Sequence, residues 1–64
     1  MVKENTSLTE EENIIYRIIT KEPIQIDEII GVSKLPAGKV SEMLLNLELK
    51  DLIKEIEGKR FIKL

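Results

Sequence analysis

The sequence contains neither cysteine nor histidine, and this absence constrains the fold more than any other feature of the chain. A chain of 64 residues has room for one domain and buries only ~60% of its unfolded surface, so many such chains depend on disulfides or zinc. This chain must instead fold around an aliphatic core, and 42% of its residues are hydrophobic. We therefore expect residues 8–64 to form one domain, with residues 1–7 as a flexible N-terminal tail.

The first helix is predicted from a capping signal followed by an isoleucine stripe. Thr9 and Glu12 have the spacing of a capping box, and the residue before Pro23 avoids helical geometry. These signals predict a helix over residues 9–21. The apolar stripe consists of Ile14, Ile15, Ile18 and Ile19. The three consecutive glutamates of the first turn, residues 10–12, are interpreted as a complement to the helix dipole.

Two further helices are predicted, joined by a tight turn at residues 33–35. Asp27 has the position of an N-cap, which predicts a short helix over residues 27–32 that buries Ile29 and either Ile30 or Val32. Pro36 suits the first position of a third helix over residues 36–50. Its core stripe is Val40, Met43, Leu44 and Leu47.

The end of the chain has the pattern of a β-hairpin. Residues 52–56 and 59–64 are both rich in β-branched and apolar residues, and Gly58 lies in the turn between them. Residues 24–26 alternate apolar and polar, so they can add a third short strand. The predicted class is α+β, a winged helix-turn-helix with three helices, a C-terminal hairpin wing and a small three-stranded sheet.

Enzymatic, metal-dependent and membrane functions are not expected. Without histidine or cysteine, the chain lacks the usual general base, the thiol nucleophile and the usual zinc ligands. No glycine pattern fits a nucleotide-binding loop, so no cofactor is expected. No apolar run approaches the ~18 residues of a membrane span. The lack of cysteine fits a cytoplasmic location, which is our expectation.

Charge is divided unevenly between the two halves of the chain. Residues 1–30 contain three lysines and arginines against seven acidic residues, whereas residues 31–64 contain seven against five. An anionic partner should therefore meet the second half, although both halves could equally be ordinary solvated surface. The net charge of −2 is unusual for a domain that binds nucleic acid without the help of another domain.

DNA binding is the default hypothesis for this architecture, because the second helix of a helix-turn-helix lies in the major groove. The residues expected near the bases are Ala37, Gly38, Lys39, Ser41 and Glu42. The expected phosphate contacts are Lys34, Lys39, Lys54, Lys59, Arg60 and Lys63. Few of these side chains can recognise bases. With about two to four phosphate contacts, binding should be weak and salt-sensitive. The preference for single- or double-stranded DNA is left open.

The position of Gly38 in the sequence allows two interpretations. Glycine in a first helical turn costs up to ~1 kcal/mol relative to alanine. It could allow a phosphate to approach the positive end of the helix closely. Equally, it could mark a poorly formed first turn.

Leu45 and Leu49 suggest a different kind of contact. At about 100° per residue they fall on the side of the third helix opposite its core stripe, and their spacing makes them neighbours on the helix surface. Two adjacent outward leucines are typical of a protein interface, with a second copy or another domain. Alternatively, the N-terminal tail or the wing could cover them.

Several strings of the sequence resemble a known family. They are Pro23-Ile24-Gln25-Ile26-Asp27-Glu28-Ile29, Leu35-Pro36 followed by Val40, Leu44-Leu45-Asn46-Leu47-Glu48-Leu49-Lys50, and Gly58-Lys59-Arg60-Phe61. Together they resemble the C-terminal winged-helix domain of DNA processing protein A, the DprA or Smf family. The chain departs from the family at Lys34 and Asp51, where glycine is frequent. These two residues are therefore expected to need a left-handed conformation.

The resemblance implies an accessory role. The parent proteins bind incoming single-stranded DNA in natural transformation, protect it and help to load the recombinase, mainly through a larger Rossmann-like domain. We therefore expect a non-catalytic DNA-binding accessory domain, either a piece of a longer protein or a stand-alone relative. The alternative is a protein-interaction or dimerisation module, which could also pack on the Rossmann-like domain. A sequence-specific transcriptional regulator is a third and less favoured hypothesis.

Overall fold

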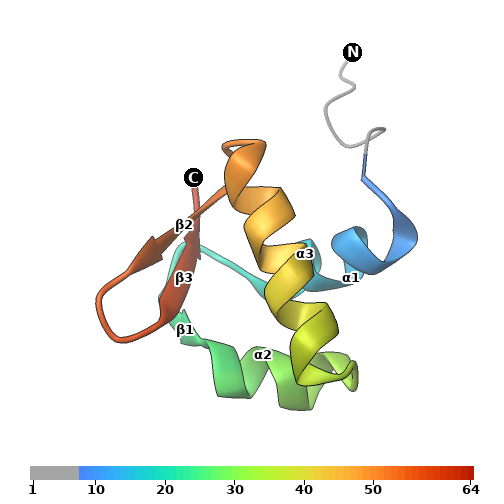
Figure 1. Ribbon diagram of the computed structural model, residues 1–64. Coiled ribbons are helices and arrows are strands. Elements are labelled where there is room, and N and C mark those ends of the chain that lie inside the picture. Colours follow the sequence, from blue (N-terminus) through green and yellow to red (C-terminus); the bar gives the residue numbers. More distant parts are fainter. Residues whose placement is uncertain (1–7) are drawn as a thin grey trace.

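The computed structural model describes residues 8–64, which form three helices and a three-stranded sheet (Figure 1). The elements are α1 (Glu10–Ile18), β1 (Ile24–Gln25), α2 (Ile26–Ser33), α3 (Ala37–Leu49), β2 (Ile53–Ile56) and β3 (Arg60–Lys63). This order confirms the predicted α+β winged-helix class. The tail expected at residues 1–7 lies outside the described residues.

Helix α1 begins as predicted and ends earlier. The Thr9 hydroxyl accepts a hydrogen bond from the Glu12 N–H, and the Glu12 carboxylate accepts one from the Thr9 N–H, each at 3.1 Å. The predicted end at Lys21 was wrong, because Ile19 is already extended (φ −84°, ψ 132°). The extended chain lets the Thr20 carbonyl accept a hydrogen bond from the Lys63 N–H at 2.7 Å. The segment after α1 is therefore tied to the sheet and not to the helix.

Helix α2 begins one residue before the predicted N-cap. Gln25 is the N-cap and makes no side-chain capping bond, while Asp27 lies inside the first turn. The assignment of Asp27 as N-cap, and of Ile26 to the strand, was therefore wrong. Pairing of Gln25 with Arg60 holds Gln25 extended, and the Ile26 N–H donates to the Lys59 carbonyl at 3.1 Å. Strand pairing therefore decides where the helix starts.

The interior and the C-terminal end of α2 agree better with the prediction than its N-terminal end does. Ile29 is fully buried and Ile30 is half-buried, whereas 58% of Val32 is exposed, which decides between the two alternatives in favour of Ile30. Lys34 ends the helix in the left-handed conformation (φ 63°), and its N–H donates to the Ile30 carbonyl. The left-handed conformation expected of this non-glycine residue is confirmed.

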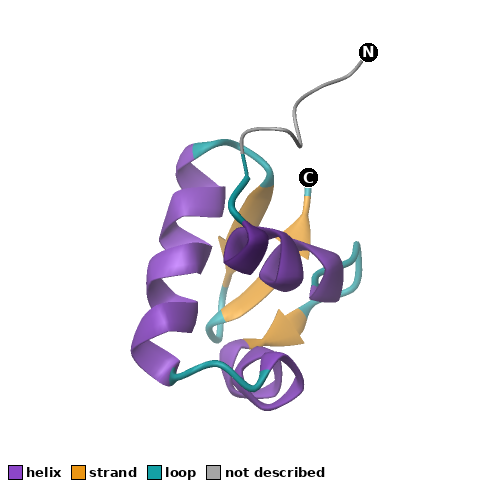
Figure 2. Ribbon diagram, turned by 90° about the vertical axis from the view of Figure 1, so that its right-hand side faces the viewer, coloured by secondary structure: helices purple, strands orange, loops and turns teal. Residues whose placement is uncertain are grey.

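Helix α3 crosses the molecule from α2 to the wing, with α1 packed against it (Figure 2). Pro36 is its N-cap and not its first helical residue, as had been predicted, because its ψ of 151° is extended. The predicted core stripe is confirmed, since Val40, Met43, Leu44 and Leu47 are all buried. The helix ends at Leu49, and Asp51 takes the expected left-handed conformation with φ 62°.

The sheet has the order β1-β3-β2, with both pairs antiparallel. The predicted third strand is confirmed, although β2 and β3 are each shorter than expected, since Leu52 and Leu64 lie outside them. The turn between β2 and β3 contains Gly58 at φ 84° and Lys59 at φ 58°. We call residues 53–63 the wing.

The core collects apolar side chains from all three helices and from β2 and β3. Its buried members are Ile15, Ile19, Ile29, Val40, Met43, Leu44, Leu47, Ile53 and Phe61. One charged side chain is buried beside them. The Glu12 carboxylate, 4% exposed, accepts hydrogen bonds from the Asn46 amide at 3.1 Å and the Lys50 ammonium at 3.0 Å. Glu12 therefore joins the start of α1 to the second half of α3.

Candidate nucleic-acid interface

The outward face of α3, which a helix-turn-helix would present to DNA, is poor in positive charge. Ala37, Gly38, Ser41 and Glu42 are exposed on it, as expected of residues near a ligand. Further along the same face, Leu45 is 56% and Leu49 is 73% exposed. The whole helix contains one lysine and two glutamates, so its formal charge is −1. This surface does not attract a polyanion.

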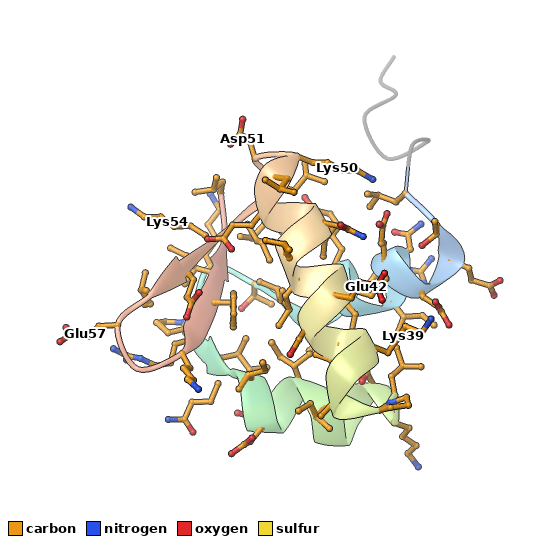
Figure 3. All side chains as sticks on the ribbon, in the orientation of Figure 1. Lys39, Glu42, Lys50, Asp51, Lys54 and Glu57 are labelled. Carbon is orange, nitrogen blue, oxygen red and sulfur yellow. The ribbon has the colours of Figure 1, made fainter. Side chains whose placement is uncertain are left out.

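The single lysine of α3 is turned toward α1. The Lys39 ammonium lies 3.4 Å from a carboxylate oxygen of Glu11, with 40% of the Lys39 side chain and 45% of the Glu11 side chain exposed. Figure 3 shows Lys39 on the side of α3 opposite the wing. The structure therefore does not bring Lys39 together with the cations of the wing.

The N-terminus of α3 is open to solvent. Its first turn carries no acidic residue and has no side-chain cap. The turn is well formed, because the Val40 N–H donates to the Pro36 carbonyl at 3.0 Å. A Cβ added at Gly38 would meet nothing within 4 Å. The interpretation of Gly38 as a mark of a poorly formed turn is therefore wrong, and packing within the domain does not require glycine there.

Three of the predicted phosphate contacts, Lys54, Lys59 and Arg60, lie close together in the sequence of the wing. In the strand pairing, Lys54 lies opposite Ile62 and Ile56 lies opposite Arg60. Directly opposed residues of antiparallel strands point to the same side of the sheet. Lys54 and Arg60 therefore share the outer face of the sheet, the side away from the buried Ile53 and Phe61. Figure 3 shows Lys54 projecting from the sheet away from α3.

The remaining candidate cations do not all lie on this face. Lys59 lies exposed in the wing turn, and the Arg60 Nε donates to the Glu57 carbonyl at 2.9 Å. Lys63 lies on the opposite face, with its ammonium 4.3 Å from the centre of the Tyr16 ring. Lys34 is exposed at the end of α2 and does not belong to the wing. Lys54, Lys59 and Arg60 form no ion pair with any of residues 8–64.

A groove lies between α3 and the wing. It has a volume of about 230 Å³ and is lined by Ile26, Ser41, Leu44, Leu45, Glu48, Glu55, Lys59 and Phe61. This groove could not be predicted from the sequence, because it depends on how β2 is placed against α3. Leu45 lies at its edge, and Leu49 continues the apolar surface one turn further along α3.

The buried position of Glu12 was also missed, although the sequence contains a signal for it. Glu12, Ile15 and Ile19 have the spacing i, i+3, i+7, which places the glutamate on the buried face of the helix. Burial raises the pKa of the Glu12 carboxyl, but the hydrogen bonds from Lys50 and the Thr9 backbone outweigh burial. The pKa of Glu12 therefore lies below its usual value of 4.5. Its role is structural.

Within residues 8–64, no helix is long and apolar enough to cross a membrane. The same part of the chain contains no group of three acidic, histidine or cysteine side chains that could hold a metal ion.

In comparisons with known proteins, the family model described as the DprA winged helix domain matches residues 3–59. No curated protein and no solved structure matches the chain.

Proposed function

The chain belongs to the DprA winged helix domain family, and from this premise we propose that it is a non-catalytic accessory domain that contacts DNA through its wing. In this proposal the domain assists a DNA-processing protein in the uptake, protection and recombination of transforming DNA. Its parent's main DNA-binding activity resides in another domain. The contribution of this chain is a weak additional contact.

The distribution of cations is the observation that carries this proposal. On α3 the lysine is engaged by Glu11, whereas on the wing Lys54, Lys59 and Arg60 form no ion pair with residues 8–64. The wing contains four cationic and two acidic side chains, a formal charge of +2 against −1 for α3. A phosphate backbone is therefore drawn to the outer face of the sheet and repelled from α3.

The number of phosphate contacts determines how strongly the domain is expected to bind DNA. Three phosphate contacts give a slope of log K against log salt of about −2.7 for duplex DNA, which is a loss of roughly 40-fold between about 50 and 200 mM salt. Such contacts position a protein without reading sequence. We therefore propose binding that is weak, salt-sensitive and independent of base sequence.

Fluorescence anisotropy with labelled single- and double-stranded oligonucleotides tests the proposal. Lys54→Gln and Lys59→Gln should each weaken binding and reduce the salt slope by about one. Lys39→Gln is the matched control, because it removes the same charge from α3 and should leave the slope unchanged. Equal effects of all three substitutions, or an effect of Lys39→Gln alone, would contradict a wing contact.

A second candidate role is docking of a protein on α3, favoured by the exposure of Leu45 and Leu49. A helix that faced only DNA would not be expected to present two large apolar side chains to it. Sedimentation equilibrium of wild type and Leu45→Glu shows whether a second copy of this chain is the partner. A concentration-dependent dimer that is lost in the variant would support self-association.

A further inference from the structure

The groove between α3 and the wing combines an apolar floor with an acidic rim. Leu44 and Phe61, 2% and 5% exposed, lie at its base. Two acidic residues, Glu48 from α3 and Glu55 from β2, line it, and its lining contains one cation, Lys59. The excess of negative charge distinguishes this groove from the outer face of the sheet.

The negative charge continues onto the exposed surface of α3. Leu45 has Glu42 three residues before it and Glu48 three residues after it, so both glutamates are its neighbours on the helix. Glu42, Glu48 and Glu55 form no ion pair with any of residues 8–64. An exposed leucine between uncompensated carboxylates is complementary to a surface that is both apolar and basic.

We propose that this groove docks a segment of a partner protein in which an arginine or lysine stands next to large apolar residues. This inference deepens the second proposed role, docking of a protein on α3. The aliphatic part of the basic side chain lies against Leu44 and Phe61, and its charged group pairs with Glu48 and Glu55. An apolar neighbour in the segment covers Leu45 and Leu49.

The same features exclude DNA from the groove. A phosphate placed beside Leu45 would meet the carboxylates of Glu42 and Glu48. Lys59 in the wing turn borders both surfaces. Apart from Lys59, the DNA contact on the outer face of the sheet and the protein contact in the groove use different residues. Each can fail without the other, which makes the two proposals separable by experiment.

The test uses an acetylated and amidated decapeptide in which two arginines flank two leucines, titrated against the labelled domain. Glu48→Gln and Glu55→Gln should each weaken binding by about two- to fivefold. The double variant should weaken binding by roughly tenfold. Glu57→Gln is the matched control, because it removes the same charge from the wing turn outside the groove and should have no effect. Thermal unfolding of each variant shows that the fold is retained.

Two control peptides examine the two parts of the contact. Replacing the arginines by glutamates, or the leucines by serines, should abolish binding at the same concentrations. The proposal is overturned if the arginine peptide shows no saturable binding at millimolar concentration, if Glu57→Gln weakens binding as much as Glu48→Gln, or if the glutamate peptide binds equally well. A wild-type dimer that Leu45→Glu dissociates would also overturn it, since a second copy would then occupy the surface.

The same glutamine variants keep the DNA proposal distinct. Glu48→Gln and Glu55→Gln should leave affinity for oligonucleotides unchanged or slightly raised, because they remove negative charge. Lys54→Gln should weaken oligonucleotide binding and leave peptide binding unchanged. Loss of both activities in any one of these variants would contradict the division into two surfaces.

Discussion

The Lys39 ammonium lies 3.4 Å from the Glu11 carboxylate, so the lysine of α3 faces α1 and not the outward surface of its own helix. Both side chains are substantially exposed, and such ion pairs contribute only ~0–1 kcal/mol. The contact therefore matters for where it places the Lys39 side chain and contributes little to stability. It pairs the one lysine of α3 with an acidic side chain of α1, on the side away from the wing. In our proposal the attraction for DNA therefore comes from the wing.

Glu11→Gln should release Lys39 with little effect on stability. We expect the unfolding free energy to change by less than about 1 kcal/mol, since the pair is exposed. Affinity for DNA should rise modestly, because one negative charge is lost and one lysine is released. Chemical denaturation and oligonucleotide titration measure the two effects. A fall in DNA affinity would show that the contact with Glu11 itself supports binding.

Glu12 makes stability depend on pH in the acid range. Its pKa in the folded protein is lowered from 4.5, so the unfolded state binds more protons between the two values and the unfolding free energy rises with pH there. The stabilisation is present above 4.5 and is lost as pH falls through the folded-state pKa. Urea denaturation across this range should show a shallower decline for Glu12→Gln than for wild type.

At neutral pH the same substitution should lower the unfolding free energy by about 1–3 kcal/mol, because hydrogen bonds to a buried carboxylate are lost. The exposed Glu10 is the control position, since it makes no bond of this kind among residues 8–64. Glu10→Gln should change stability by less than half as much. If the unfolding free energy of Glu12→Gln fell with decreasing pH in the same way as that of wild type, the role assigned to the carboxylate would be refuted.

Gly38→Ala should stabilise the domain by about 0.5–1 kcal/mol, since alanine is the better helix former and its Cβ meets open space. The matched control is Gly58→Ala. At φ 84° and with the Arg60 Nε at 3.4 Å from the new Cβ, it should destabilise. The midpoints of urea denaturation give the change in unfolding free energy for both variants when the m-value is unchanged. DNA affinity should be unaffected by Gly38→Ala, whereas close phosphate contact at the start of α3 would make it fall.

Asp51→Gly should stabilise the chain by up to about 1 kcal/mol. Asp51 occupies the left-handed region at φ 62°, where glycine has no steric penalty. The same substitution at Asp27, inside the first turn of α2, should be destabilising, because glycine weakens a helix interior. Thermal unfolding of both variants compares the two environments directly. An equal loss of stability in Asp51→Gly and Asp27→Gly would mean that the conformation of Asp51 carries no strain.

Local signals predicted the parts of the fold that depend on neighbouring residues. The capping box of Thr9 and Glu12 and the core stripe of α3 were both confirmed, because each depends on helical spacing alone. The outward position of Leu45 and Leu49 followed from the same spacing and is confirmed by their exposure. Their role in binding a protein stays a prediction.

Features that depend on how distant elements meet could not be predicted in this way. Asp27 has a good capping side chain, but the pairing of Gln25 with Arg60 places the helix start earlier. The engagement of Lys39 by Glu11, and the groove beside Glu55, both require the packing of α3 against other elements. The predicted cations of the candidate site could therefore be named from the sequence, but the pairing of Lys39 with Glu11 could not.

The most direct measurement of the wing contact is an amide chemical-shift map of the domain titrated with a short DNA duplex at low salt. Contact through the wing should give shifts concentrated at Gln25, Lys54, Lys59, Arg60 and Ile62, which vanish as salt is raised. Shifts concentrated instead at residues 37–42 of α3, with the wing silent, would contradict it.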